Sequence, residues 1–438
     1  MSTSTPENEP DKLNLVRALG RGDLTALAIN GIIGAGIFGL PSAVAALLGN
    51  ASPIAFVACA AIVGIIVLCF AEVASHFTDT GGPYLYARSV FGPLVGFEVG
   101  WAIWLARISA FAANANLLIA YFGFFVPGLS TGAGRIISIT LVVAVLAGIN
   151  VRGVAMGARF GDAFAIMKLI PLIAFGTIGL YFVDWETYST IQAPTSVSFG
   201  SAVLLLVYAF TGFEYAAIPA AEAKQPRKDI SWALLYALGI AAVIYLAVQV
   251  VAVGTYPGLA QSERPLADAG QAFLGPIAGG VMAFAALVSI LGNLSAVMLI
   301  GPRLTYAFAE KGEFPAFLGR LHSRFRTPVA SIALFAFLVW ALALSGTFVW
   351  LATISVVARL GAYMVTCAAV PVIRKRSSIP PEFRLMFGPL IPVLAIVLGI
   401  WLYAQTNLRD TLSFLVAVLI GSFLYFGMKS KDTTNGDR

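Results

Sequence analysis

The stretch INGIIGAGIFGLP, residues 29–41, opens the first long apolar segment of the chain. It is rich in glycine and ends on Pro41, although each interior glycine costs a helix about 1 kcal/mol relative to alanine. Glycines such as Gly34 and Gly36 let a helix unwind inside a membrane, where its free N–H groups favour a carboxylate and its free carbonyls can bind a ligand. The stretch therefore predicts a discontinuous helix, and the alternative is that the glycines only permit close helix packing.

The composition indicates a membrane protein. The chain has 438 residues, of which 59% are hydrophobic and 11% are charged, with a mean hydropathy of +0.89, whereas a soluble domain has about 25% charged residues. The polar first 23 residues lack the pattern of a cleavable signal peptide. Cys59, Cys69 and Cys367 lie in apolar runs and the chain has only two histidines, so we expect no disulfide framework, no metal site and no cofactor.

Twelve segments are apolar enough, over about 20 residues each, to span a membrane. They are residues 24–47, 53–77, 94–124, 135–153, 160–183, 199–222, 232–256, 276–309, 328–346, 349–373, 388–405 and 409–428. With the N-terminus inside, the outer loops hold only Arg135, Arg264 and Arg409. Because basic loops stay in the cytoplasm, this asymmetry predicts a multi-pass protein of the cell membrane (the inner membrane of a Gram-negative cell) with both termini cytoplasmic. It also explains the net charge of +6 without nucleic acid.

A second apolar segment is interrupted at YAFTGFEYAA, residues 208–217, which places Gly212 and Glu214 inside the run. It lies five predicted spans after the first break, and paired interrupted segments at matching positions indicate a transporter binding site. Because five is an odd number, the two halves are expected to have opposite topology. The predicted fold is all-α, with a 5+5 inverted repeat and two extra helices. Its parts are a cytoplasmic tail at 1–23, repeats at 24–183 and 199–373, a helix pair at 388–428 and a cytoplasmic tail at 429–438.

Five motifs resemble those of the amino acid–polyamine–organocation superfamily. They are GIIGAGIFGLP (31–41), AEVASHFTDTGGPYLYARSVFG (71–92), YAFTGFE (208–214), AKQPRKDI (223–230) and GPRLTYAFAEKGEFP (301–315). They occur in the order found in the family and cover nearly the whole chain. The resemblance implies a LeuT-type fold and alternating-access transport of amino acids or amines, and it says little about the substrate.

The resemblance also implies which residues hold the substrate. Family members hold the α-carboxylate on the unwound backbone of helix 1 and the α-amino group on carbonyls of helices 1 and 6. The matching positions are Ile32, Ala35, Gly36 and Ile37 in the first break, and Tyr208, Ala209, Thr211 and Gly212 in the second. The family's outer gate is often an aromatic residue at the Tyr208 position, and the alternative is a buried packing tyrosine.

Four ionisable residues, Arg107, Lys168, Glu214 and Arg359, lie well inside predicted spans, where such groups are costly and usually functional. Lys168 resembles the lysine that replaces a sodium ion in sodium-independent members, where it donates to carbonyls of helices 1 and 8. Burial disfavours its charged form, which suggests proton coupling, and the alternative is a permanent structural charge. Glu214 matches a carboxylate that helps to close the cytoplasmic half, either structurally or as a proton relay. Arg359 is expected to snorkel or to bridge helices, and Glu72 to form a structural bridge.

Arg107 departs from the family pattern. It follows Ala106 on the third predicted span, where related transporters face the substrate. If Arg107 faces the site, it repels a cationic side chain and pairs with an acidic one. The alternative is that Arg107 turns into another interhelical gap and pairs with Glu98 or a carbonyl.

The function expected from these features is secondary active transport of an amino acid, independent of sodium and coupled to protons, with a neutral or acidic substrate favoured. An obligate exchanger of amino acids or amines is the alternative, and a non-transporting amino acid sensor is the alternative from another class. A membrane-embedded enzyme is not expected, because the chain contains no HExxH motif and no cluster of acidic and basic residues with catalytic spacing. An ATP-driven pump is not expected either, because there is no GxxxxGK[ST] motif. The expected partners are an amino acid, protons and membrane lipid, and the oligomeric state stays open.

Overall fold

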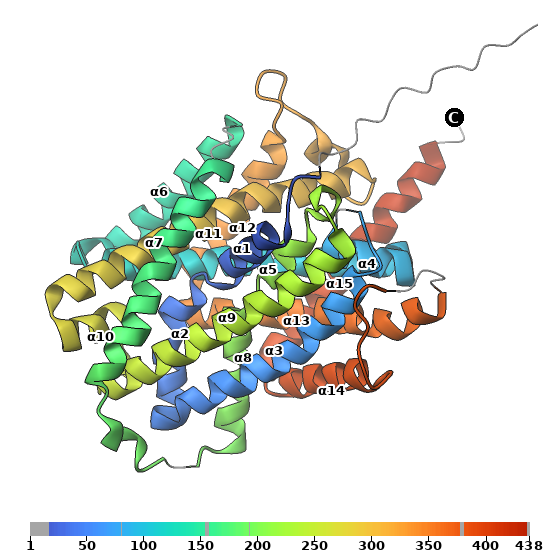
Figure 1. Ribbon diagram of the computed structural model, residues 1–438. Helices are drawn as coiled ribbons and strands as arrows, with labels where there is room; N and C mark the ends of the chain where they lie inside the picture. Colours follow the sequence, from blue (N-terminus) through green and yellow to red (C-terminus); the bar gives the residue numbers. More distant parts are fainter. Residues whose placement is uncertain (1–16, 80, 154–156, 192, 377–380, 436–438) are drawn as a thin grey trace, which may run out of the picture.

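The computed structural model describes residues 17–435, apart from residues 80, 154–156, 192 and 377–380 (Figure 1). Within these residues the chain forms helices joined by turns and loops, with an isolated bridge between Leu19 and Ala223. Most of the predicted N-terminal tail and the end of the C-terminal tail, residues 1–16 and 436–438, lie outside the described residues. The all-α prediction is confirmed.

The helices agree closely with the predicted spans. They are α1 (Arg21–Ile32), α2 (Gly36–Leu48), α3 (Ser52–Ala74), α4 (Gly82–Phe91), α5 (Pro93–Phe122), α6 (Gly132–Val151), α7 (Gly157–Ile178), α8 (Ser196–Phe210), α9 (Pro226–Thr255), α10 (Pro265–Leu274), α11 (Pro276–Glu310), α12 (Val329–Ser345), α13 (Phe348–Arg376), α14 (Leu390–Ala404) and α15 (Leu408–Asn435). Within the described residues, eight helical stretches are long and apolar enough to cross a membrane, and three further apolar helices are shorter. The chain is therefore a multi-pass membrane protein, and the number of twelve spans stays a prediction.

Two short helices, α4 and α10, were not predicted from the sequence. Each precedes a long helix at the same place in its half of the chain, α4 before α5 and α10 before α11. Each is followed by one glycine with positive φ, Gly92 (+95°) after α4 and Gly275 (+81°) after α10. A proline then begins the next helix. Glycine tolerates this backbone and proline suits the first helical position. The matching sequences FGPLVG (91–96) and LGPIAG (274–279) were a detectable signal for this shared turn.

The helices pack so that the two interrupted spans meet in the interior. α2 packs against α8, and α1 packs against α9 and against the 3₁₀ turn Phe213–Ala217 that follows α8. α5 packs against α11, α12 and α13, which come from the second half of the chain. The site is therefore built from both halves of the chain.

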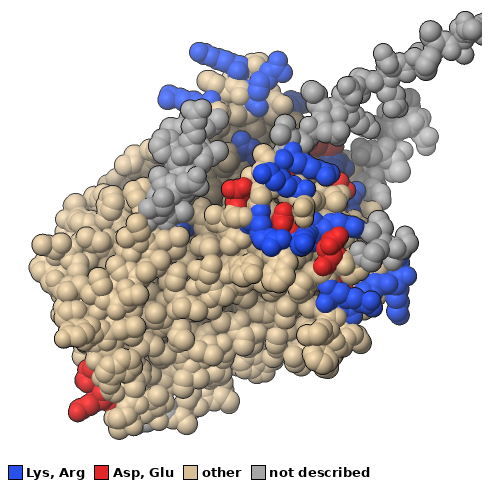
Figure 2. Space-filling view, in the orientation of Figure 1, with Lys and Arg blue, Asp and Glu red and all other residues tan. Residues whose placement is uncertain are grey.

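The surface is divided by charge. On the face seen in Figure 2, the Lys and Arg side chains gather toward the top and right of the view, and a wide band without charged side chains lies below them. Large apolar side chains are exposed on several helices, including Ile137 on α6, Val243 on α9 and Val397 on α14. An uncharged, apolar surface is what contact with lipid requires.

Candidate functional site

The first break separates α1 from α2. α1 ends at Ile32 and α2 begins at Gly36, which confirms the predicted discontinuous helix. Lys168 Nζ, from α7, donates hydrogen bonds to the carbonyl oxygens of Asn30, at 2.9 Å, and Ile33. The buried ammonium group thus binds carbonyls at the end of α1. Both described hydrogen bonds of Lys168 go to carbonyls of the first predicted span. The second bond that the family resemblance implies, to a carbonyl of the eighth span (α11), is not found among the described residues.

The second break ends α8 at Phe210. A 3₁₀ turn, Phe213–Ala217, follows in place of the continuous helix that the span 199–222 would form. Thr211 has extended backbone and Gly212 has a left-handed φ of +103°. The Gly212 N–H donates to Glu214 Oε2 at 2.9 Å. The Glu214 carboxylate therefore satisfies the backbone that the break exposes.

The two breaks touch each other. A Cβ atom at Gly31 would lie 2.4 Å from the carbonyl oxygen of Gly212, and one at Gly36 would lie 2.6 Å from the Cα of Ala209. The Tyr245 hydroxyl, from α9, donates to a carbonyl of each break, at 2.8 and 3.1 Å. Unwinding and close packing, which the sequence left as alternatives, thus occur together.

A cavity of about 30 Å³ lies between the breaks. Several of the predicted substrate-binding residues line it, namely Ile32, Ala35, Gly36, Tyr208, Thr211 and Gly212. The others, Ile37, Ala106, Arg107 and Ala209, are buried and lie outside the lining. Lys168 and Glu214 also lie outside it and reach the site through the backbone that they bind. A cavity of this size can hold water but not a whole amino acid, so the site has to widen before a substrate can bind in it.

An asparagine pair forms part of the cavity wall and was missed in the sequence. The Tyr208 hydroxyl donates to Asn114 Oδ1 at 2.6 Å, and Asn114 Nδ2 donates to Asn293 Oδ1 at 2.8 Å. These bonds join α8, α5 and α11 around the cavity. Tyr208 also packs edge-on against Phe348, with ring centroids 6.1 Å apart. Its hydroxyl is satisfied as the packing alternative requires, and its role as a gate stays a prediction. Isolated amides inside apolar spans were the available signal.

A buried ion pair lies at the other side of the cavity. Arg359 Nη1, from α13, donates to Glu214 Oε1 at 2.6 Å, and the Tyr363 hydroxyl donates to Glu214 Oε2 at 3.1 Å. Both charged side chains are 5% exposed, and Arg359 lines the cavity. Of the two expectations for Arg359, bridging between helices is confirmed and snorkelling is wrong.

Arg107 lies behind the cavity wall. Its guanidinium carbon is 5.5 Å from the ring centroid of Tyr215, and Tyr215 lines the cavity. The expected pairing of Arg107 with Glu98 or with a carbonyl is not found among the described residues, where Glu98 Oε1 accepts a hydrogen bond from Ser422 at 2.8 Å and Glu98 Oε2 has no partner. The Ala106 carbonyl accepts from Ser355, and the α5 residues on the cavity lie a turn further along, at Ala110 and Asn114. Direct substrate contact by Ala106 and Arg107 therefore stays a prediction.

Comparison with known sequences agrees with this architecture. A sequence model of the amino acid permease family matches residues 19–428. The chain belongs to the amino acid permease family. Curated relatives of the permease include the methylthioribose transporter of Bacillus subtilis (strain 168), 27% identical over 94% of this chain and 93% of that protein. A second relative is the branched-chain amino acid permease BcaP of Lactococcus lactis subsp. cremoris (strain MG1363), which is 28% identical over 92% of each chain. A third is the serine/threonine exchanger SteT of B. subtilis (strain 168), which is 29% identical over 92% of this chain and 95% of that protein.

One sequence pattern of hydrolases does occur in the permease, but its surroundings do not fit it. The pentapeptide GLSTG, residues 128–132, matches the GxSxG pattern, which functions at a sharp turn between a strand and a helix. Here it follows α5 in the turn that leads into α6, and Ser130 Oγ donates to the carbonyl of Pro127 at 2.9 Å. No histidine lies near it in sequence, since the chain has only His76 and His322.

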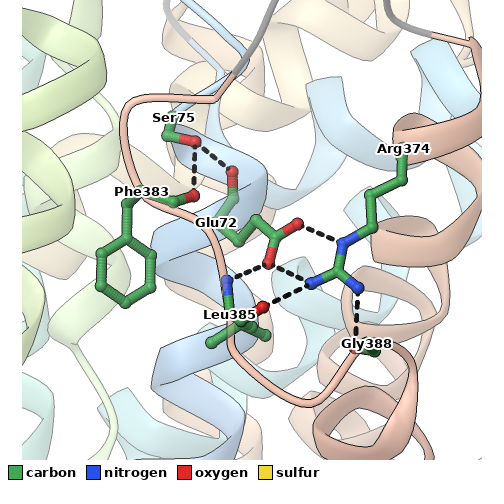
Figure 3. Close-up of polar contacts among 6 residues, drawn as sticks. All are labelled: Glu72, Ser75, Arg374, Phe383, Leu385 and Gly388. Carbon is green, nitrogen blue, oxygen red and sulfur yellow. Dashed lines mark hydrogen bonds and ion pairs between the residues drawn. The ribbon is translucent and has the colours of Figure 1, made fainter.

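A second carboxylate–arginine pair joins the last turns of α3 and α13, and neither of its residues lines the cavity (Figure 3). Arg374 Nε and Nη2 donate to the two carboxylate oxygens of Glu72 at 2.6 and 2.7 Å. The N–H of Leu385 donates to Glu72 Oε2 at 2.8 Å, and Ser75 Oγ donates to the carbonyl of Phe383 at 3.2 Å. The pair thus fastens the segment before α14 to the end of α3, which confirms the structural bridge expected of Glu72.

Proposed function

We propose that this permease carries a neutral or acidic amino acid across the cell membrane by alternating access, as a secondary active transporter. The observation that carries the proposal is the meeting of two interrupted helices at one cavity, with α2 beginning at Gly36 on its wall. The first N–H groups of a helix have no intrahelical acceptor and favour an anion, so the start of α2 suits an α-carboxylate. The carbonyls near the end of α8 suit an α-amino group.

The inverted repeat belongs to this proposal. The shared turns at Gly92–Pro93 and Gly275–Pro276 support it, because they occupy equivalent places in residues 24–183 and 199–373. With the basic loops inside, the charged end of Figure 2 faces the cytoplasm and both termini lie there. Movement of one half against the other would then expose the cavity to each side of the membrane in turn.

We further propose that Lys168 replaces a sodium ion. Its ammonium group binds the carbonyl oxygens of Asn30 and Ile33, as a cation between helices would. Transport is then independent of sodium, and release of a proton from Lys168 during the cycle would couple transport to the proton gradient. If Lys168 stays charged throughout, the permease works instead as an exchanger, which the relation to the serine/threonine exchanger SteT favours as the second candidate function.

Uptake by the purified protein in proteoliposomes tests the proposal. The panel should contain labelled leucine, serine, glutamate and arginine, together with methylthioribose because of the relative that transports it. Each is measured with sodium or choline outside, with and without an inward proton gradient, and with or without the same amino acid inside. Accumulation driven by the proton gradient supports symport, and uptake only into preloaded vesicles supports exchange. Binding of an amino acid without any uptake would identify a sensor and contradict transport.

A further inference from the structure

A guanidinium group that has no hydrogen-bond or ion-pair partner among the described residues lies next to the cavity. Arg107 is 5% exposed, and the described part of the chain offers it neither a hydrogen bond nor an ion pair, with Nη1 fully buried. Its contact is with the ring of Tyr215, which separates it from the cavity. An unpaired charge away from water is costly, so this arrangement favours the arrival of an anion.

The neighbouring groups do not neutralise this charge. Arg359 lines the cavity and pairs with Glu214, yet its Nε is buried without a partner among the described residues. Glu214 is fully engaged, because its second oxygen accepts from the Gly212 N–H and the Tyr363 hydroxyl. Two guanidinium groups thus share one carboxylate on this side of the cavity.

Lys168 does not reduce the excess positive charge near the cavity. Its ammonium group is already bound by the carbonyl oxygens of Asn30 and Ile33. It adds a third cation to the surroundings of the cavity, and Glu214 is the carboxylate that pairs with a cavity-lining residue. A zwitterion with a neutral side chain would leave the excess positive charge in place.

We propose that Arg107 and Arg359 form an anion-binding subsite of this cavity and that it receives the side-chain carboxylate of an acidic amino acid. The inference rests on the proposed function, since it names the substrate class for the same site. The α-groups of the substrate lie at the two breaks, and its side chain points toward α5 and α13. The ring of Tyr215, in the 3₁₀ turn after the second break, must turn aside for the carboxylate to reach Arg107. A guanidinium fork binds a carboxylate through two parallel hydrogen bonds.

Isosteric pairs of amino acids test the subsite most sharply. Thermal shift of the purified protein is measured with L-glutamate against L-glutamine and with L-aspartate against L-asparagine, in gluconate buffer. One acid should bind more tightly than its amide by on the order of tenfold, the effect of a hydrogen-bonded charge. A chloride titration in the same buffer distinguishes a small inorganic anion from the substrate's own carboxylate. Chloride that competes with the acid but not with the amide identifies a shared anion subsite.

The variant Arg107→Gln should remove the preference for the acid, because it deletes the spare charge without unpairing Glu214. Arg303→Gln is the matched control, since Arg303 is exposed on α11 and donates to its own helix at the Leu299 carbonyl. Arg107→Lys, which keeps the charge but loses the fork, should retain part of the preference. If Arg107→Gln does not fold, the wild-type acid-to-amide and chloride comparisons decide the question.

The outcomes separate this inference from the proposed function. Tighter binding of an acid that is lost in Arg107→Gln and kept in Arg303→Gln supports the subsite. Equal or tighter binding of the amides to the wild type, with no effect of chloride, overturns the subsite while leaving amino acid transport intact. Binding and uptake of none of the amino acids would instead contradict the proposed function itself.

Discussion

Two carboxylate–arginine pairs in the described part of the permease, Glu214–Arg359 and Glu72–Arg374, differ in how completely their hydrogen-bonding groups are satisfied. Glu72 and Arg374 bind each other through two bonds, and the remaining donors of Arg374 bond to the carbonyls of Leu385 and Gly388 (Figure 3). At the cavity, Glu214 is satisfied, whereas Arg359 keeps a buried nitrogen without a partner in the described structure. A pair whose donors all bond to its own carboxylate and to the backbone only holds two segments of the chain together. A pair that leaves cationic donors free beside a cavity has the capacity to bind a ligand.

The largest effect is expected when Arg359 is replaced by Ala. This leaves Glu214 charged and unpaired in the interior, which should destabilise the protein by about 3–5 kcal/mol. Thermal unfolding in detergent measures this loss. The double variant Glu214→Gln/Arg359→Met should regain most of the stability, because it removes both charges. An Arg359→Ala protein as stable as the wild type would show that the pair is not buried as described.

The second largest effect is expected when Lys168 is replaced by Ala. The carbonyls of Asn30 and Ile33 lose their donor, and an unsatisfied buried polar group costs about 1–3 kcal/mol. We expect uptake to be lost while substrate binding stays measurable, and wild-type uptake to be unchanged when choline replaces sodium. Lys224→Ala, at an exposed position, is the control. Saturable dependence of wild-type uptake on sodium would contradict the assignment.

Arg374→Ala breaks the other pair and should cost about 2 kcal/mol, less than the loss at Arg359. The difference follows from exposure, because the Arg374 side chain is 15% exposed and water can reach the vacated space. The substrate affinity of the folded fraction should not change, as measured by the same thermal-shift titration. A change in affinity as large as that in Arg107→Gln would remove the distinction between the two pairs.

The smallest effect is expected for Tyr208→Phe. It deletes one hydroxyl that donates to Asn114, a bond worth about 1 kcal/mol. We expect a several-fold rise in the KM of uptake if Tyr208 faces the substrate, with little change in unfolding temperature. Phe348→Leu, which alters only the packing on the ring, provides the comparison. An unchanged KM in Tyr208→Phe would show that the hydroxyl does not contribute to substrate binding.

The helical part of the fold was predictable because lipid demands long apolar segments, and glycine identified both breaks in advance. Six of the substrate-binding residues predicted from the family resemblance line the cavity, since backbone positions in a break follow directly from the motif. Ala106 and Arg107 lie about one turn before the α5 residues that line the cavity, Ala110 and Asn114, and their contact with the substrate stays a prediction. A uniformly apolar helix such as α5 gives no period from which its inward face could be read. Whether Arg107 has an ion-pair partner depends on which side chains surround it in the fold. This could not be predicted, because no local sequence pattern indicates those neighbours.

Cysteine substitution on α5 tests the central claim, that the substrate binds between the two helix breaks. Ala110 lines the cavity and Ala106, one turn earlier, does not. The variants Ala110→Cys and Ala106→Cys are reconstituted, treated with a small methanethiosulfonate reagent, and assayed for uptake with and without the transported amino acid during the reaction. We expect that modification of Ala110→Cys blocks uptake and that the transported amino acid slows this modification. We expect that uptake by Ala106→Cys is not changed by the reagent. Substrate protection at Ala106→Cys, with Ala110→Cys unaffected, would contradict the central claim.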